Sequence, residues 1–174
     1  GRLPARTVVA TVMSNVGLEV ALREAGITLV RTAVGDRYVL EEMLRHGYTL
    51  GGEQSGHVIF AAHNTTGDGI VTALQVLAAM ARSRKSLSEL AACMRRFPQV
   101  LENIRVRRRE DLATLPAVQQ EIRNAEAALA DAGRVLVRYS GTEPLARVMI
   151  EGPDEGKIRV LAANIAAAIR ATIG

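Results

Sequence analysis

Residues 138–147 of the chain read Arg-Tyr-Ser-Gly-Thr-Glu-Pro-Leu-Ala-Arg. A short run flanks this stretch on each side, Arg134–Val137 before it and Arg147–Glu151 after it, and each run predicts a β-strand. The middle of the stretch is small and hydroxylated and contains a glycine, so its backbone N–H groups can turn inward and stay unshielded. The sequence therefore predicts a donor-rich loop between two strands of a sheet.

Side chains add further hydrogen-bond donors to this loop. Ser140 and Thr142 carry hydroxyl groups beside Gly141. Arg138 and Arg147 carry guanidinium groups at the two ends. Such a set of donors suits a phosphate dianion, which offers many acceptor lone pairs and no donor. The alternative is a polar hairpin turn with solvated arginines, because turns favour the same residue types.

These residues carry a resemblance to a known family. Arg-x-Ser-Gly-Thr-Glu-Pro followed by Arg-Val-Met resembles the phosphate-binding loop in the last domain of the α-D-phosphohexomutases. Gly52–His57 (Gly-Glu-Gln-Ser-Gly-His) is similar to that family's sugar-binding loop, and Val34–Val39 (Val-Gly-Asp-Arg-Tyr-Val) resembles its phosphoglucosamine mutase branch in particular. The resemblance covers nearly the whole chain, but only the C-terminal half, the third and fourth domains, of the family's four-domain enzyme.

The order of the predicted elements divides the chain into two domains. Strands and helices alternate as β-α-β-α-β-β-α in the first part, which predicts a mixed, mostly parallel sheet of the α/β class. Phe97-Pro98 marks the expected boundary, giving a sugar-binding α/β domain at 1–96 and a phosphate-binding α+β domain at 97–174. In the second domain we expect helices on one face of a small antiparallel sheet. The resemblance implies a TATA-binding-protein-like fold for it.

The second motif supplies candidate sugar contacts. Glu53, Ser55 and His57 occupy alternate positions of an extended segment, so their side chains can line one wall. Carboxylates and hydroxyls are good partners for sugar hydroxyls, and the flanking Gly52 and Gly56 allow close approach of the backbone. A plain polar hairpin is the alternative without the resemblance. His57 could be a neutral donor or a cation near phosphate, and both roles stay open.

Asp36 and Arg37 are the remaining candidate sugar-binding residues. From the residues alone, Asp36 is an N-cap for a helix that runs to about Arg45 and is stopped by Gly47. Relatives that act on mannose or glucose phosphates commonly carry His at this point. A carboxylate there is chemically sensible beside a substrate with an ammonium group, which favours glucosamine phosphate.

Two further segments resemble catalytic loops of the family but lack their chemistry. Ala62–Thr65 lacks the Ser and Pro of the nucleophile loop, and Gly67–Gly69 has one carboxylate where the Mg²⁺ loop has three. We interpret Asp68 as a helix cap and expect neither a catalytic residue nor a metal site in this chain. The resemblance implies that a phosphoserine and Mg²⁺ belong to the missing N-terminal domains of the same protein, so the fragment alone is expected to be inactive.

Composition limits the partners of the chain. Hydrophobic residues make up 48% of the 174 residues and aromatic residues only 3%, with a net charge of +4. So few aromatic side chains to stack on bases argue against nucleic acid as a partner. No stretch is long and apolar enough for a membrane helix and no signal peptide is apparent, so we expect a cytoplasmic protein without a membrane partner. A homodimer is compatible with the sequence, which does not fix the oligomeric state.

The single cysteine excludes an internal disulfide. Cys93 falls within a short predicted helix, Leu87–Arg96, whose alanine-rich pattern predicts a small core residue at this position.

The resemblance implies an isomerase that moves a phosphoryl group between O6 and O1 of glucosamine phosphate through a phosphoserine, in the synthesis of amino-sugar and cell-wall precursors. The substrate partner is then a hexosamine phosphate. A phosphomannomutase/phosphoglucomutase is the alternative within the family. A stand-alone anion-binding module and a weak nucleic-acid binder that uses Arg105–Arg109 and the Arg138 loop are the alternatives from other classes.

Overall fold

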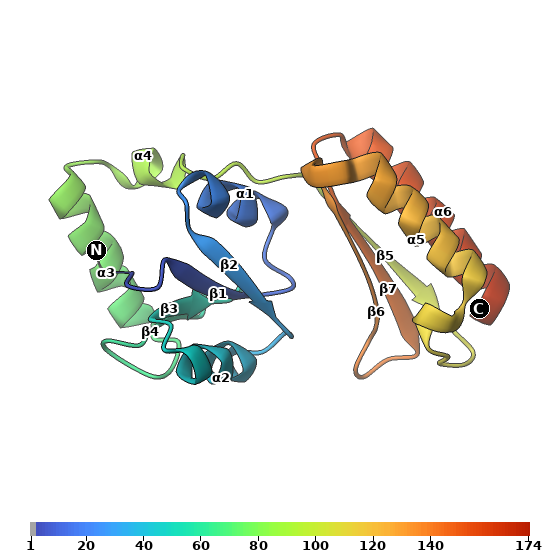
Figure 1. Ribbon diagram of the computed structural model, residues 1–174, viewed down its shortest axis with the longest axis horizontal. Coiled ribbons are helices and arrows are strands. Elements are labelled where there is room, and N and C mark those ends of the chain that lie inside the picture. The colour runs from blue at the N-terminus through green and yellow to red at the C-terminus, as the bar shows by residue number, and fades with distance from the viewer. Residues whose placement is uncertain (1–2) are drawn as a thin grey trace. The chain divides into compact units, whose positions relative to one another are not determined.

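The computed structural model describes residues 3–174, which form two compact units divided between Arg96 and Phe97. Figure 1 shows the helices and strands of each unit. The elements of the first unit are β1 (Thr7–Thr11), α1 (Val16–Glu24), β2 (Thr28–Thr32), α2 (Asp36–His46), β3 (Leu50–Gly52), β4 (Val58–Phe60), α3 (Gly69–Ser83) and α4 (Leu87–Ala91).

The first unit is built on a four-stranded sheet in the order β2-β1-β3-β4. Strand β1 runs parallel to β2 and β3, and β4 pairs antiparallel with β3. Helices α1 and α2 lie on opposite sides of this sheet (Figure 1). A small core of Val9, Val39, Met43 and Ile59 joins α2 to the strands. A Cβ at Gly51 would lie 2.6 Å from Met43 Sδ, so α2 packs this closely only against glycine.

Local caps set most helix ends in this unit. The Asn15 side chain accepts from the Gly17 N–H at the start of α1, and Asp68 accepts from two backbone N–H groups at the start of α3. The cap by Asp68 confirms its prediction.

The prediction that Asp36 caps α2 is wrong. Gly35 is the N-cap with a φ of 132°, and Asp36 is the first helical residue, whose carboxylate accepts from the Arg37 N–H. The cap moves by one residue because glycine tolerates this positive φ and its N–H has an acceptor elsewhere in the fold, the Glu53 carboxylate. Gly47 ends the helix in the left-handed region, as predicted.

The second unit combines a three-stranded sheet with two long helices. Its elements are β5 (Gln99–Arg105), a 3₁₀ turn (Leu112–Thr114), α5 (Pro116–Leu129), a second 3₁₀ turn (Ala130–Ala132), β6 (Arg134–Tyr139), β7 (Leu145–Glu151) and α6 (Glu155–Ile173). Strand β7 lies in the centre and pairs antiparallel with both β5 and β6. Helices α5 and α6 cover one face of the sheet (Figure 1).

The core of this unit lies between the sheet and the two helices. Fully buried positions of α6 recur along one side of the helix and include Ile158, Ile165 and Ile169. They belong to the same core cluster as Val148 and Ile150 of β7. Val148 and Ile150 are two residues apart, so their side chains lie on the same face of the strand. The predicted fold class, an α/β domain with a mixed sheet followed by a smaller α+β domain, is confirmed.

Three boundaries differ from the predictions. Strand β6 continues to Tyr139 and β7 begins at Leu145, so Arg138 lies in a strand rather than in the loop, and Arg147, the expected first residue of its strand, lies inside β7. Helix α4 ends at Ala91, and Cys93 is exposed, so the prediction of a core cysteine is wrong. Among residues 3–174, no helix is long and apolar enough to cross a membrane.

We expect Ile165→Ala to destabilise the second unit by about 2–5 kcal/mol, because Ile165 is fully buried and its truncation leaves a cavity in the core. The measurement is urea denaturation followed by far-ultraviolet circular dichroism.

Val160→Ala on the same helix is the matched control, because Val160 is 61% exposed. It should change the free energy of unfolding by no more than about 0.5 kcal/mol. Equal effects of the two substitutions would contradict the assigned core.

Candidate functional site

Hydrogen bonds close the loop between β6 and β7 into a fixed turn. The Ser140 N–H donates to Leu145 O at 2.8 Å, and the Leu145 N–H donates to Glu143 O at 2.8 Å. The Glu143 N–H donates to Ser140 Oγ at 3.3 Å, and Ser140 itself is buried. The Ser140 hydroxyl therefore shapes the loop, while its own O–H proton is still available for donation.

Two backbone N–H groups of this loop are left for a ligand. Within the described residues, the N–H groups of Gly141 and Thr142 have no hydrogen-bond partner, and both residues are exposed. A Cβ built on Gly141 meets nothing within 4 Å, and Gly141 does not adopt a positive φ. Neither backbone conformation nor packing within the chain requires glycine here, so the open space is free for the close approach of a ligand.

Arg138 and Arg147 lie directly opposite each other in the register of β6 and β7. Residues paired in this way point to the same face of a sheet, and like charges placed there destabilise it. The Arg147 Nη2 atom pairs with Glu143 at 2.8 Å, and its Nε is buried without a partner within the described chain. The Arg138 Nη1 atom donates to Tyr139 O at 3.3 Å. A bound anion would relieve the repulsion between the two guanidinium groups.

A residue that sequence reasoning did not assign to the site also contacts this loop. The Arg109 Nη2 atom donates to Ser140 O at 2.8 Å and to Glu143 O at 2.7 Å. Its guanidinium lies 5.7 Å from the centre of the Tyr139 ring. The only signal for it in the sequence is the run Arg107-Arg108-Arg109, which does not distinguish one arginine from the next.

The candidate sugar loop of the first unit is a second tight turn. The Glu53 N–H donates to His57 O at 2.8 Å, and the Gly56 N–H donates to Glu53 O at 3.1 Å. Gly56 has a φ of 98°, a conformation that side-chain-bearing residues rarely adopt. The turn brings the side chains of Ser55 and His57 together, with 3.2 Å between Ser55 Oγ and His57 Nδ1.

The carboxylate of Glu53 connects this loop to the start of helix α2. Its Oε1 accepts from the Gly35 N–H at 3.0 Å, and its Oε2 lies 3.6 Å from His57 Nδ1. The Glu53 side chain is only 10% exposed, whereas that of His57 is 60% exposed. The structure thus brings the two predicted sugar segments together, and a structural role for Glu53 accompanies the predicted one.

Asp36 and Arg37 both lie exposed at this end of α2. The Arg37 Nε atom pairs with Glu41 at 2.7 Å. The hydrogen bond to the Glu41 carboxylate, with the attraction of its charge, raises the pKa of the Arg37 guanidinium above its ordinary value. The Asp36 side chain uses only Oδ1 for the bond from the Arg37 N–H, so both exposed side chains remain accessible to a ligand.

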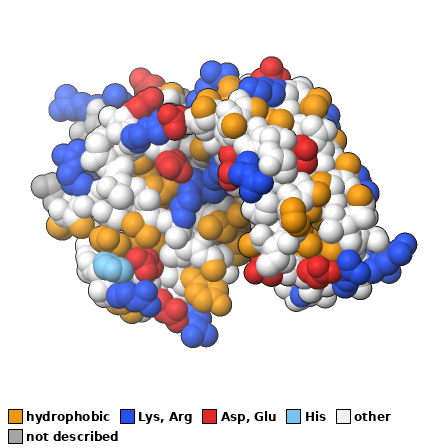
Figure 2. Space-filling model, turned by 45° about the vertical axis from the view of Figure 1, so that its right-hand side comes forward, with side chains coloured by type: hydrophobic (Ala, Val, Ile, Leu, Met, Phe, Trp, Pro, Cys, Tyr) orange, Lys and Arg blue, Asp and Glu red, His pale blue; other side chains and the backbone are white. Residues whose placement is uncertain are grey.

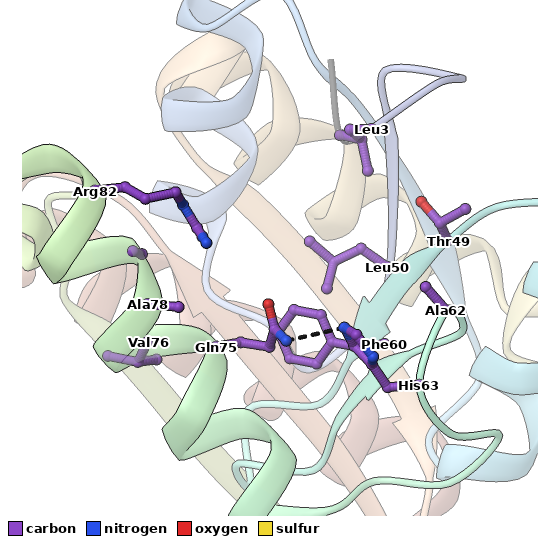
Figure 3. Close-up of a pocket in the computed structure, with 11 residues that line it drawn as sticks. Leu3, Thr49, Leu50, Phe60, Ala62, His63, Gln75, Val76, Ala78 and Arg82 are labelled. Atoms are coloured by element: carbon purple, nitrogen blue, oxygen red, sulfur yellow. Dashed lines mark hydrogen bonds between the residues drawn. The ribbon is translucent and has the colours of Figure 1, made fainter.

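A separate pocket of about 650 Å³ lies between α3 and the β3–β4 edge of the first unit. Its lining is mostly apolar and includes Leu50, Phe60 and Val76. Figure 3 shows the His63 and Gln75 side chains joined across it by a hydrogen bond of 2.9 Å. None of the predicted sugar or phosphate residues lines this pocket, so we do not assign the candidate site to it.

The described residues offer no metal centre, because residues 3–174 contain no group of three or more His, Cys, Asp or Glu side chains that could hold an ion. Asp68 uses one carboxylate oxygen, Oδ1, to cap α3 through the N–H groups of Ile70 and Val71. A lone capping carboxylate does not meet the needs of octahedral Mg²⁺.

Charge is mixed over the surface shown in Figure 2. Lys and Arg side chains alternate there with Asp and Glu, and hydrophobic side chains lie exposed between them. This face carries no continuous basic band of the kind that follows a nucleic-acid backbone.

Comparison with protein families gives two consecutive matches. A family model described as "Phosphoglucomutase/phosphomannomutase, alpha/beta/alpha domain III" matches residues 1–97. A second, described as "Phosphoglucomutase/phosphomannomutase, C-terminal domain", matches residues 101–168.

Curated relatives are similar over the whole chain. The phosphoglucosamine mutase of Syntrophotalea carbinolica is 58% identical over 174 residues, 100% of this chain and 38% of the relative. That of Symbiobacterium thermophilum is 61% identical over 170 residues, 98% of this chain and 38% of the relative. The chain thus spans well under half the length of the curated relatives that it matches.

Among solved structures, the fold matches Aspergillus fumigatus N-acetylphosphoglucosamine mutase in complex with GlcNAc-6P and magnesium. The TM-score is 0.77 at 22% identity, over 97% of this chain and 39% of that one. A phosphoglucomutase/phosphomannomutase family protein from Burkholderia thailandensis matches with a TM-score of 0.68 at 20% identity, over 95% of this chain and 37% of that one. At these identities the likeness shows the fold alone.

We expect Glu53→Ala to expose the Gly35 amide, because the substitution removes its hydrogen-bond acceptor. Hydrogen exchange of this amide, measured by NMR, should become about tenfold faster or more. Glu41→Ala is the control, since Glu41 lies on α2, the helix that follows Gly35, and within residues 3–174 its carboxylate forms an ion pair with Arg37 and no hydrogen bond with Gly35. Unchanged Gly35 exchange in the Glu53 variant would contradict the link between the two loops.

Proposed function

The chain belongs to the phosphoglucomutase/phosphomannomutase family, and we propose that it is the substrate-binding C-terminal part of a phosphoglucosamine mutase. The intact enzyme would interconvert glucosamine 6-phosphate and glucosamine 1-phosphate. Relatives with that name are similar over the whole chain, which supports this substrate over mannose or glucose phosphates. The chain covers 38% of their length, so the complete reaction depends on parts beyond this segment.

The observation that carries the proposal is the donor set at the β6–β7 loop. Two guanidinium groups, those of Arg138 and Arg147, face each other in register. The N–H groups of Gly141 and Thr142, which have no hydrogen-bond partner within residues 3–174, lie in the adjoining loop. A phosphate dianion bound beside this loop would accept hydrogen bonds from these groups and would offset the repulsion between the arginines.

This loop binds and orients phosphate without transferring protons. Arginine does not lose its proton in proteins, and backbone amides are donors only. Its role is to hold the phosphate that is not reacting and so to position the other end of the sugar for transfer. Because a phosphate presents the same oxygens from either end of the substrate, one loop serves both orientations of a bis-phosphorylated intermediate.

The loop of Glu53, Ser55 and His57 would bind the sugar. The Glu53 carboxylate is held by the Gly35 N–H and can accept hydrogen bonds from sugar hydroxyls through its remaining lone pairs. Ser55 can both donate and accept. Asp36, exposed at the adjoining end of α2, supplies a negative charge suited to the ammonium group of glucosamine.

The nucleophile and Mg²⁺ would belong to the rest of the protein. The described residues hold no metal cluster, and Asp68 serves as a helix cap. In phosphoryl transfer, Mg²⁺ neutralises negative charge on the phosphate oxygens. We therefore expect the 174-residue chain to bind sugar phosphate and to show no mutase activity by itself.

Two other functions have less support. A phosphomannomutase/phosphoglucomutase would use the same phosphate loop, and assay of the full-length enzyme with mannose or glucose phosphates in place of glucosamine phosphate separates the two. A stand-alone anion-binding module would have no coding sequence for a nucleophile serine loop upstream in its gene.

We expect Arg138→Met in the full-length enzyme to lower kcat/KM about 10- to 100-fold, the usual effect of losing a charged hydrogen bond to a ligand. The loss should exceed about tenfold for glucosamine 6-phosphate and glucosamine 1-phosphate alike, because the loop binds phosphate in both directions. Arg159→Met is the control, since Arg159 is an exposed arginine on α6 that pairs with Glu155. Equal kinetics of the Arg138 variant and wild type would refute the proposed phosphate site.

A second test separates binding from folding. Gly141→Ala should leave the free energy of unfolding within about 0.5 kcal/mol of wild type, because the added Cβ meets nothing in the chain. The same methyl group should hinder the approach of phosphate to the loop N–H groups and weaken binding about tenfold or more, as measured by NMR titration of the chain. Full phosphate affinity in this variant would show that Gly141 does not face the ligand.

A further inference from the structure

We propose that Arg109 is a positioning residue of the phosphate loop. It binds two loop carbonyl groups and thereby presents the loop N–H groups to the phosphate. The inference rests on the proposed function, because it concerns how the same loop grips its ligand. It adds a residue that lies outside the phosphate motif, 31 residues before Ser140.

Arg109 engages both ends of the loop with one nitrogen. Its Nη2 donates to Ser140 O, at the end of β6, and to Glu143 O, just before Pro144. A guanidinium bound to two carbonyl oxygens fixes their separation and neutralises their partial negative charge. Without it, those oxygens would be free to turn toward the anion and repel it.

Peptide geometry carries this effect to the ligand side. In a trans peptide, the C=O of one residue and the N–H of the next point in opposite directions. With Ser140 C=O directed at Arg109, the Gly141 N–H is directed away from it, and this amide is one of the two without a partner. The Glu143 carbonyl is followed by Pro144, which has no backbone N–H, so this second bond orients no further donor. Arg109 therefore sets the direction of a donor that it never touches.

Strand β6 holds Arg109 in place. The Tyr139 ring lies under the guanidinium at 5.7 Å, and the Tyr139 hydroxyl donates to Glu110 O at 2.7 Å. Arg109 forms no salt bridge within residues 3–174. Two supports on one aromatic residue keep the arginine oriented before the ligand arrives, which lowers the cost of ordering the loop on binding.

A purely electrostatic role is the competing explanation, and neighbouring residues allow a direct comparison. Arg107 is exposed, lies two positions away, and forms no side-chain hydrogen bond or ion pair with the loop within residues 3–174. Lysine at position 109 would keep the charge but would replace the planar, forked guanidinium by a flexible point charge. Attraction at a distance is screened by salt, whereas the geometry of the loop is not.

The experiment is an NMR titration of the 174-residue chain with inorganic phosphate and with glucosamine 1-phosphate, at low and at high salt. The shifts of Gly141 and Thr142 amides report binding in wild type and in Arg109→Met, Arg109→Lys and Arg107→Met. We expect about tenfold weaker binding in Arg109→Met at both salt concentrations and a loss in Arg109→Lys as well. Arg107→Met should show a small loss that disappears at high salt.

Three results would overturn the inference. Wild-type affinity in Arg109→Met, or full affinity in Arg109→Lys, would leave no positioning role for the guanidinium. Absence of any loop shift in the wild-type chain would instead refute the proposed phosphate site itself, and the inference with it. If Arg109→Met does not fold, Arg109→Lys and Tyr139→Phe, which removes only the hydroxyl bond to Glu110, provide the comparison: weaker phosphate binding in both supports the inference, and unchanged binding in both overturns it.

Discussion

The register of strand β7 determines the geometry of the loop between β6 and β7, the proposed phosphate site. Ala146, Val148 and Ile150 lie on one side of this strand and are fully buried under the helices of the second unit. The strand also pairs with β5 along one edge and with β6 along the other. A slip by one residue would move these side chains out of the core, so the register has a single favourable value. That value places Arg147 opposite Arg138. The packing of the core thus sustains a pair of like charges that would separate in a freely moving hairpin.

In the first unit, the carboxylate of Glu53 fixes the arrangement of the candidate loops, whereas in the second unit strand register does so. Glu53 is nearly buried, and its bond to the Gly35 N–H joins a loop after β3 to the first turn of α2. Gly35 has no side chain with which to cap the helix, so this distant carboxylate supplies the acceptor that the helix end requires. Negative charge at a helix N-terminus is favoured by the helix dipole. Removal of Glu53 would therefore disturb two segments, and a loss of binding alone would not prove sugar contact.

Sequence reasoning succeeded where the deciding contacts are local and failed where they are distant. The family, the fold class and the cap at Asp68 were predicted correctly, because motif residues and caps act within a few positions of the chain. The contacts of Arg109 cross 31 and 34 residues, and the acceptor for Gly35 lies 18 residues away, so neither could be predicted from spacing. Cys93 was placed in the core because a composition typical of helix continues past the point where α4 ends. The assigned sugar and phosphate contacts themselves stay predictions.

The absence of a metal-binding cluster from the described residues has a physical rationale on the proposed function. A phosphate loop works because donors and positive charge outnumber acceptors, and only Glu143 offsets the charge of Arg147 there. Three carboxylates for Mg²⁺ beside this loop would cancel the charge of both arginines and weaken the grip on the non-reacting phosphate. On the proposed function, placing the two sets of groups on different domains would avoid this conflict. The same separation would leave the two loops to bind substrate without a metal site beside them among the described residues.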